Sequence, residues 1–209
     1  MAILEDISTY LQQGRAKNVK TLVAEALEQG IPAQQILDEG LLAGMDIIGE
    51  KFKNNEVYVP EVLLSARAMT MGAEILKPHL SEEGATEKGV VILGTVKGDL
   101  HDIGKNLVRM MMEGKGLKVF DLGTDVPAER FVEAAIENNS KVIGCSALLT
   151  TTMGEMGNVV NLVKEKGLDI SVMVGGAPVT EDFAQSIGAT YYSADAATAA
   201  DIALELATK

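Results

Sequence analysis

The sequence has one cysteine, few basic side chains and no long hydrophobic run. The cysteine, Cys145, lies in the apolar run 142–145, which excludes an intrachain disulfide and favours a packed core residue over a metal ligand. A lone thiol of this kind is typical of a reducing compartment, so we expect a cytoplasmic protein. No apolar run approaches the ~20 residues that span a bilayer, and the acidic N-terminus lacks the pattern of a signal peptide.

Basic side chains are too few to form a positive surface. The chain has 18 Lys and Arg against 30 Asp and Glu, and its net charge of −12 is shared between residues 1–88 and 89–209. Without a basic stripe, neither nucleic acid nor an anionic membrane surface is an expected partner. The length of 209 residues, 47% of them hydrophobic, allows one large or two small domains with a sizeable core.

The first 80 residues have the period of α-helices. Apolar residues recur at helical spacing over four segments, which end near residues 14, 30, 54 and 78. Pro60 opens the fourth segment, where a missing amide hydrogen is tolerated. Amphipathic helices with short connections predict an all-α four-helix bundle over residues 1–80.

The period changes after a polar stretch at 81–88, which we interpret as a linker. Beyond it, strand-like and helix-like segments alternate. The strand-like runs are 90–96, 117–122, 142–147, 170–174 and 190–192, and the helix-like segments lie near 102–115, 127–138, 152–166, 180–187 and 195–207. This alternation predicts an α/β domain over 89–209, with a five-stranded parallel sheet of flavodoxin-like (Rossmann-like) strand order.

The turn after the first strand is the most informative stretch, and it reads Gly98-Asp99-Leu100-His101-Asp102-Ile103-Gly104. Open α/β sheets bind ligands at the carboxyl ends of their strands. A histidine placed there, two residues after a carboxylate, is a natural metal ligand with its own orienting partner. The spacing is one residue too long for a Walker A loop, and the three glycines of a dinucleotide fingerprint are absent. An exposed loop histidine without a ligand remains the alternative.

Two other strand ends carry small and hydroxyl residues. The third strand ends in the run Ser146-Ala147-Leu148-Leu149-Thr150-Thr151-Thr152, and the fourth ends in Gly175-Gly176. In a doubly wound sheet these ends converge with His101 at one edge, where small residues would open a slot beside the sheet. Taken singly, each motif also fits a tight turn or a buried hydroxyl.

Together the three motifs resemble the cobalamin-binding domain of corrinoid proteins from methyltransferase systems and of methionine synthase. The matching patterns are Asp99-x-His101-x-x-Gly104, Ser146-x-Leu148 and Gly175-Gly176. In the helical half, Phe52 and the segment 58–66 resemble the cap bundle that covers the upper face of the corrinoid in this family. The resemblance therefore extends over nearly the whole chain.

The resemblance implies a bound cobalamin or related corrinoid, with cobalt ligated from below by His101. Asp99 would hydrogen-bond the far nitrogen of His101, and Thr152 would extend this relay, so these three are the candidate catalytic residues. The nucleotide tail of the cofactor would enter the slot near Ser146, Leu148, Gly175 and Gly176. The remaining residues expected at the cofactor are Gly98, Asp102, Ile103, Gly104 and Thr150, together with Phe52, Val59 and Val62 of the cap. Ordinary bundle core is the alternative for the cap residues.

The family's chemistry implies a methyl carrier. Its cobalt would take a methyl group as Co(I) from a TIM-barrel substrate methyltransferase and give it up as methyl-Co(III) to a second methyltransferase acting on tetrahydrofolate or coenzyme M. A reductive activase would reduce cobalt that has become Co(II), and turnover without these partners is not expected. Two alternatives remain. The cobalamin subunit of an adenosylcobalamin mutase would not need a methyl-shielding cap, and a cobalamin-based sensor would need a basic DNA-binding module.

Overall fold

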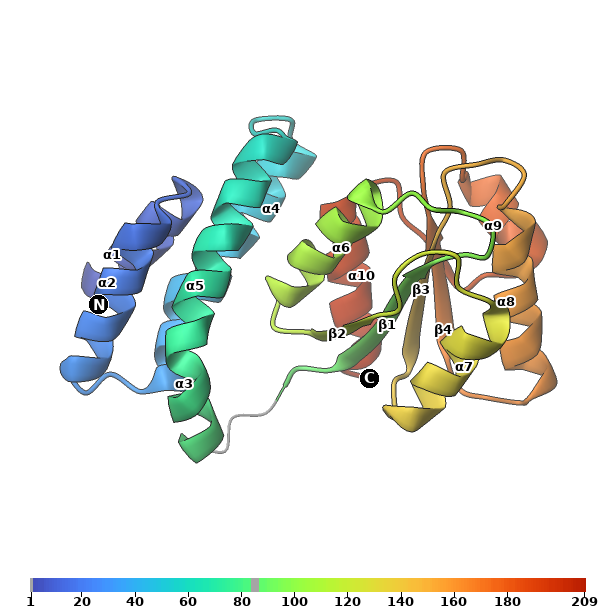
Figure 1. Cartoon of the computed structure of the whole chain (residues 1–209). Coiled ribbons are helices and arrows are strands. Elements are labelled where there is room, and N and C mark those ends of the chain that lie inside the picture. The colour runs from blue at the N-terminus through green and yellow to red at the C-terminus, as the bar shows by residue number, and fades with distance from the viewer. Residues whose placement is uncertain (1, 84–86) are drawn as a thin grey trace. The chain divides into compact units, whose positions relative to one another are not determined.

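Helices alone build the first part of the chain, and a parallel sheet flanked by helices builds the second (Figure 1). The structure, a computed structural model, describes residues 2–83 and 87–209. The chain divides into two units, Met1–Thr86 and Glu87–Lys209, each with its own buried core. No helix among the described residues combines the length and the apolar character that crossing a bilayer requires.

The helical unit contains the four amphipathic segments that the sequence predicts. They are α1 (Ala2–Gln12), α2 (Ala16–Glu28), a continuous segment made of α3 (Ala33–Gln35), a π-helical stretch (Ile36–Leu42) and α4 (Ala43–Lys53), and finally α5 (Val59–Glu83). The close approach of α4 to α1 depends on Gly44, because a Cβ there would lie 3.2 Å from the carbonyl oxygen of Ser8. The π-helical stretch has no counterpart in the sequence prediction.

Helix α5 runs further than the sequence predicts. The expectation that the fourth helix ends near Pro78 is wrong, because the helix continues through this proline to Glu83. A proline in a helix removes the hydrogen bond to the carbonyl four residues earlier. Here that carbonyl belongs to Glu74, which is exposed like Pro78, so water can satisfy it. Residues 81–83 of the expected linker are thus helical, whereas residues 84–86 lie outside the described residues.

The second unit holds the predicted five-stranded parallel sheet. Its strands are β1 (Val90–Thr95), β2 (Lys118–Asp121), β3 (Val142–Ser146), β4 (Ser171–Gly175) and β5 (Tyr191–Tyr192), in the order β2-β1-β3-β4-β5. The flavodoxin-like order is therefore confirmed. The register places Thr95, Ser146 and Gly175 side by side at the carboxyl ends of three neighbouring strands.

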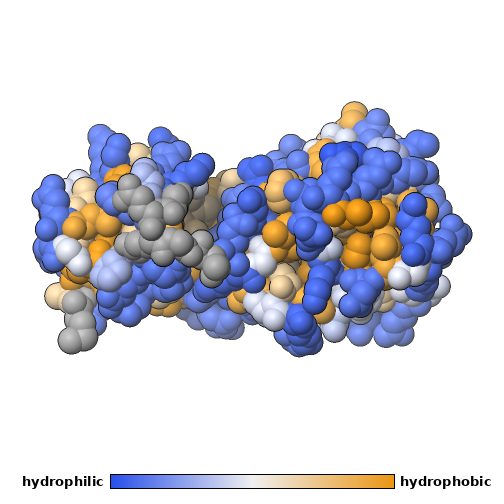
Figure 2. All heavy atoms as spheres, turned by 90° about the horizontal axis from the view of Figure 1, so that it is seen from below, coloured by the Kyte–Doolittle hydropathy of each residue, from blue (hydrophilic) through white to orange (hydrophobic). Residues whose placement is uncertain are grey.

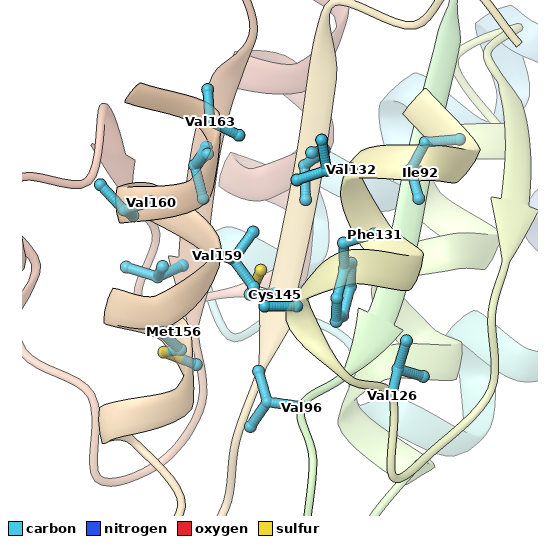
Figure 3. Close-up of a cluster of buried hydrophobic side chains, with 14 of the residues drawn as sticks. Ile92, Val96, Val126, Phe131, Val132, Cys145, Met156, Val159, Val160 and Val163 are labelled. Carbon is cyan, nitrogen blue, oxygen red and sulfur yellow. The ribbon is translucent and has the colours of Figure 1, made fainter. Parts of the chain in front are cut away.

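Helices cover both faces of this sheet (Figure 1). Helices α6 (Ile103–Glu113) and α10 (Ala196–Ala207) lie on one face, and α7 (Ala128–Glu137), α8 (Gly154–Glu165) and α9 (Glu181–Ile187) lie on the other. Figure 3 shows side chains of α7 and α8 directed at β1 and β3, with Cys145 among them. Burial raises the pKa of the Cys145 thiol, so this cysteine is an inert core residue, as predicted.

The surface agrees with the acidic, polar composition. In the face seen in Figure 2, hydrophilic residues predominate on the surface of each unit. Hydrophobic residues form separate patches among these hydrophilic residues. The larger apolar side chains are therefore mostly used for the two cores.

Phe131 of α7 is fully buried and is the largest side chain of the core beneath that helix. We expect Phe131→Ala to lower the free energy of unfolding of residues 87–209 by about 3–5 kcal/mol, because it removes an aromatic ring and leaves a cavity. Urea unfolding followed by hydrogen exchange and mass spectrometry would measure this loss. The matched control is Ile136→Ala on the exposed side of the same helix, with a change of about 0.5 kcal/mol or less. Equal effects of the two variants would contradict this packing.

Candidate functional site

The loop between β1 and α6 presents His101 at the carboxyl edge of the sheet. The buried hydroxyl of Thr95 donates a hydrogen bond of 2.8 Å to the carbonyl oxygen of His101. Gly98 turns the chain with φ +81°, a left-handed conformation that favours glycine. The amide of Asp99 donates to the carbonyl oxygen of Val96 at 3.1 Å. These contacts fix the backbone on both sides of Asp99.

Asp99 is a fully buried carboxylate surrounded by hydrogen-bond donors. One oxygen, Oδ1, accepts from the backbone amide of His101 at 3.1 Å and lies 2.8 Å from its ring nitrogen Nδ1. The other, Oδ2, accepts from the amides of Leu148 and Leu149 and from the Thr152 hydroxyl, at 2.8, 3.2 and 2.8 Å. Burial alone would raise the pKa of Asp99, but the bonds from Leu148, His101 and Thr152 outweigh it and hold this pKa well below its usual range.

An ionised Asp99 determines which nitrogen of His101 is available. The carboxylate can only accept a hydrogen bond, so Nδ1 of His101 carries the proton and donates it. In the neutral ring, Nε2 then keeps its lone pair. Half of the His101 side chain, 51%, is exposed. The sequence-predicted pair therefore forms an oriented metal ligand with its free nitrogen accessible.

Exposed apolar side chains surround this imidazole. Leu100 and Ile103 are 74% and 80% exposed, and Leu148 and Leu149 lie exposed on the neighbouring loop. A group of exposed large apolar side chains is typical of a binding surface. Gly104 leaves it open, because a Cβ at this position would meet no atom of the other described residues within 4 Å. A glycine here leaves room for a bulky ligand at this surface.

The ends of β3 and β4 approach each other closely. Gly176 has φ +142°, and a Cβ there would overlap the carbonyl oxygen of Ala147. A Cβ on Gly175 would lie 3.2 Å from the carbonyl oxygen of Ser193. Gly176 is therefore required by the fold, as the tight-turn alternative stated, whereas a side chain at Gly175 would only be crowded; both glycines keep the edge beside Ser146 free of side chains.

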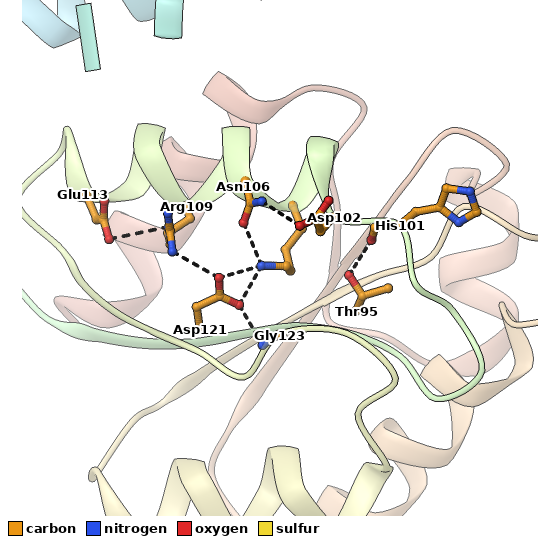
Figure 4. A network of polar contacts seen from close by, with 9 residues as sticks. Thr95, His101, Asp102, Asn106, Arg109, Glu113, Asp121 and Gly123 are labelled. Carbon is orange, nitrogen blue, oxygen red and sulfur yellow. Dashed lines mark hydrogen bonds and ion pairs between the residues drawn. The ribbon is translucent and has the colours of Figure 1, made fainter. Parts of the chain in front are cut away.

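A buried ion pair anchors the start of α6 behind His101 (Figure 4). Lys105 is 3% exposed, and its Nζ lies 2.6 Å from both carboxylate oxygens of Asp121 at the end of β2. Arg109 donates to the same carboxylate at 3.2 Å, and the amide of Gly123 donates at 2.9 Å. Burial raises the pKa of Asp121, but these partners outweigh it, and the net pKa is lowered. Figure 4 shows the His101 ring directed away from this network.

The remaining predicted site residues occupy three environments. Asp102, which follows His101 directly, and Thr150, on the loop after β3, are both exposed, and Asp102 accepts a hydrogen bond from Asn106 at 3.1 Å. Phe52, Val59 and Val62 belong to the helical unit, where Phe52 and Val59 are partly exposed. Val62 is fully buried, which fits the bundle-core alternative for this residue. A role of the three cap residues at the cofactor stays a prediction.

The sequence prediction missed Thr95, Lys105, Asp121 and Asp125, all of which hold the His101 loop. Lys105 follows the motif directly, and the two aspartates follow the second strand. The predicted strand order already made β2 the neighbour of β1, so the acidic end of β2 was the signal that could have identified them.

The donor set fits a metal that brings most of its ligands with it. No group of three or more His, Cys, Asp or Glu able to hold a metal ion exists among residues 2–83 and 87–209. A single accessible imidazole nitrogen can complete the coordination of a metal held by a macrocycle, and the apolar rim and the open Gly104 suit a large planar group. The residues at the sheet edge thus fit a corrinoid.

Comparisons with known proteins show the family to which the chain belongs. Two family models, each described as a B12 binding domain, match residues 89–205 and 3–77. A corrinoid protein of Desulfitobacterium hafniense strain Y51 is 40% identical, covering 100% of this chain and 97% of that protein. Dimethylamine corrinoid protein 1 of Methanosarcina acetivorans is 43% identical over 90% of this chain and 91% of its own length. The methanol:cobalamin methyltransferase complex MtaBC of Methanosarcina barkeri contains a chain of similar structure, with a TM-score of 0.86 and 32% identity over 97% of this chain and 78% of that one.

The Lys105–Asp121 pair generates a prediction for stability. We expect Lys105→Met to destabilise residues 87–209 by about 3 kcal/mol, because the partly buried carboxylate of Asp121 loses its main counter-charge while Arg109 partly compensates. The double variant Lys105→Met, Asp121→Asn should recover much of this loss, as a double-mutant cycle in urea would measure. The control is Arg130→Met, which breaks an exposed pair with Glu137 and should change stability by about 1 kcal/mol or less. Additive effects of the two network substitutions would contradict the coupling.

Proposed function

Because the chain belongs to the B12-binding corrinoid proteins, we propose that it is the methyl carrier of a corrinoid-dependent methyltransferase system. The observation that carries the proposal is the pairing of buried, ionised Asp99 with exposed His101, which supplies one oriented metal ligand. Full-length similarity to a dimethylamine corrinoid protein, and structural similarity to a methanol:cobalamin methyltransferase complex, support the carrier role.

The bound corrinoid supplies a cobalt centre that can accept and release a methyl group. His101 would hold this cobalt through Nε2, while Nδ1–H stays hydrogen-bonded to Asp99. Asp99 would keep the imidazole oriented both when it ligates the metal and when it does not. Thr152 and the amides of Leu148 and Leu149 keep Asp99 ionised through both states.

The edge of the sheet offers room for the rest of the cofactor. We propose that the nucleotide tail lies beside Ser146 and Leu148, along the side-chain-free edge that Gly175 and Gly176 create. Gly98, Asp102, Ile103, Gly104 and Thr150 would line the corrin-facing surface around His101. The exposure of Ile103 and the open space at Gly104 support this assignment.

The helical unit is the proposed cap over the upper face of the cofactor. The match of residues 3–77 to a B12 binding domain model supports a role of this unit in binding. Phe52 and Val59 are partly exposed and available for contact, whereas the burial of Val62 assigns this residue a supporting role within the bundle.

Separate partners would load and unload the methyl group. We propose a TIM-barrel substrate:corrinoid methyltransferase as donor enzyme, a methylcorrinoid:tetrahydrofolate or coenzyme M methyltransferase as acceptor enzyme, and a reductive activase. The similarity to a methanol:cobalamin methyltransferase complex supports a methyltransferase partner. The described site contains one metal ligand and an apolar rim, features that bind a cofactor and do not read a methyl donor.

His101→Ala tests the ligand assignment. We expect the variant to fold, because the side chain is half exposed, and to bind aquacobalamin roughly tenfold or more weakly with loss of the histidine-ligated absorbance. Spectral titration of the purified protein measures both. His79→Ala is the matched control, since His79 is the chain's second histidine and is exposed on α5. Unchanged spectrum and affinity in His101→Ala would overturn the assignment.

A carrier should turn over nothing alone. We expect the protein loaded with methylcobalamin to keep its methyl group in the presence of tetrahydrofolate or coenzyme M, because the described surroundings of His101 are its carboxylate partner and an apolar rim. Loss of the methylcobalamin absorbance should begin only when the acceptor methyltransferase is added. Steady demethylation without a partner would argue against the carrier function.

A further inference from the structure

Besides the Asp121–Lys105 contact, the loop after β2 is hydrogen-bonded to the His101 loop at a second place. Val96 and Val126 form a parallel bridge, which brings Asp125 next to the turn at Gly98. Asp125 Oδ1 accepts a hydrogen bond of 2.7 Å from the amide of Gly98, and the Asp125 amide donates one of 2.9 Å to the carbonyl oxygen of Asp99. Asp125 thus holds the Gly98–Asp99 pair at its first amide and at its last carbonyl group.

Asp125 makes these two hydrogen bonds from a left-handed backbone conformation. Its φ of +55° lies in the left-handed region, where aspartate and asparagine are tolerated better than other residues with a Cβ. Gly98, across the contact, is also left-handed, with φ +81°. The hydrogen bonds of Asp125 to the Gly98 amide and to the Asp99 carbonyl oxygen offset the conformational cost of its left-handed backbone.

The hydrogen bond from Asp125 holds the backbone of Asp99, which the partners of its carboxylate do not contact. Leu148, Leu149 and Thr152 fix the Asp99 carboxylate. Asp125 instead fixes the carbonyl group of Asp99 and the amide of Gly98. The direction of the His101 ring depends on the carboxylate and on the backbone of Asp99. The ring is hydrogen-bonded to the carboxylate, and the backbone of His101 continues from that of Asp99 two residues earlier. Releasing the backbone would let the Asp99–His101 unit pivot.

We propose that Asp125 is a positioning residue for the metal ligand: by holding the Gly98–Asp99 backbone, it keeps the His101 imidazole aimed at the cofactor. The inference rests on the proposed function, in which His101 ligates cobalt. Asp125 acts through a hydrogen bond to the Gly98 amide, and its negative charge is not required for that bond. This distinction makes the proposal testable with conservative variants.

Two substitutions separate the contributions of Asp125. Asp125→Asn keeps an oxygen acceptor and a residue that tolerates the left-handed conformation, but it removes the charge. Asp125→Gly keeps the backbone free to adopt this conformation and removes the acceptor. The control is Asn139→Gly, which changes another left-handed residue, φ +50°, on the stretch leading into β3 at the opposite edge of the sheet.

The first measurement uses the protein without cofactor. In the wild type, ¹⁵N NMR of the ring should show His101 protonated on Nδ1, and hydrogen exchange should show a protected Gly98 amide. Asp125→Gly should lose the Gly98 protection and mix the two ring tautomers, whereas Asp125→Asn and Asn139→Gly should match the wild type. A freely exchanging Gly98 amide in the wild type would overturn the proposal, even if the glycine variant failed to fold.

The second measurement uses cob(II)inamide, which lacks a nucleotide base, so that any axial nitrogen in its electron paramagnetic resonance spectrum comes from the protein. Asp125→Gly should bind about tenfold more weakly, as expected for the loss of one hydrogen bond, with a reduced axial-nitrogen splitting. Asp125→Asn should stay within about twofold of wild type. Full splitting in Asp125→Gly, or an equal loss in Asp125→Asn, would overturn the positioning role. Absence of the splitting in wild type would instead overturn the proposed function, while the ring tautomers still decide the role of Asp125.

Discussion

The buried carboxylate of Asp99 is the constraint on which the site depends. An isolated charge at this depth would be strongly unfavourable, so the fold must provide donors for it. Both oxygens are satisfied by the loop after β3 and by His101, at distances of 2.8 to 3.2 Å. Satisfying this charge joins the ends of β1 and β3 and selects the tautomer of His101 in one step. The electrostatics that stabilise the edge of the sheet and the chemistry of the metal ligand are therefore the same set of contacts.

The acidic end of β2 supports this arrangement from the other side. Asp121 anchors Lys105 at the start of α6, and Asp125 holds Gly98 at the start of the loop. The loop that carries His101 is thus held at both ends by one neighbouring segment. A metal ligand must keep its direction when the ligand atom is exposed, and exposed loops are otherwise the most mobile parts of a fold. Anchors at both ends resolve this conflict without burying the imidazole.

Periodicity and spacing predicted most of this molecule. The four helical segments and the five strands follow from hydrophobic patterns of period 3.6 and from apolar runs between turn residues, and the order β2-β1-β3-β4-β5 was expected because five parallel strands suit the flavodoxin-like topology. The pairing of Asp99 with His101 follows from their two-residue spacing. Pro78 was misjudged because a local rule against proline ignores a carbonyl that water can satisfy. Asp125 was missed because its partner is 27 residues away, and only the pairing of loops after parallel strands reveals it.

Exposure of the ligand nitrogen separates binding from selectivity in the proposed carrier. His101 offers its free nitrogen among Leu100, Ile103 and Leu148, which are apolar and exposed. Such a surface recognises a large planar cofactor by area and by one coordinate bond, and it offers no hydrogen bonds with which to discriminate small methyl donors. Discrimination of that kind needs buried polar groups that a wrong substrate leaves unpaired. Since the described buried polar groups near His101, such as Thr95 and Thr152, are already hydrogen-bonded within the chain, the proposed carrier would leave selection of the donor to the pocket of a partner.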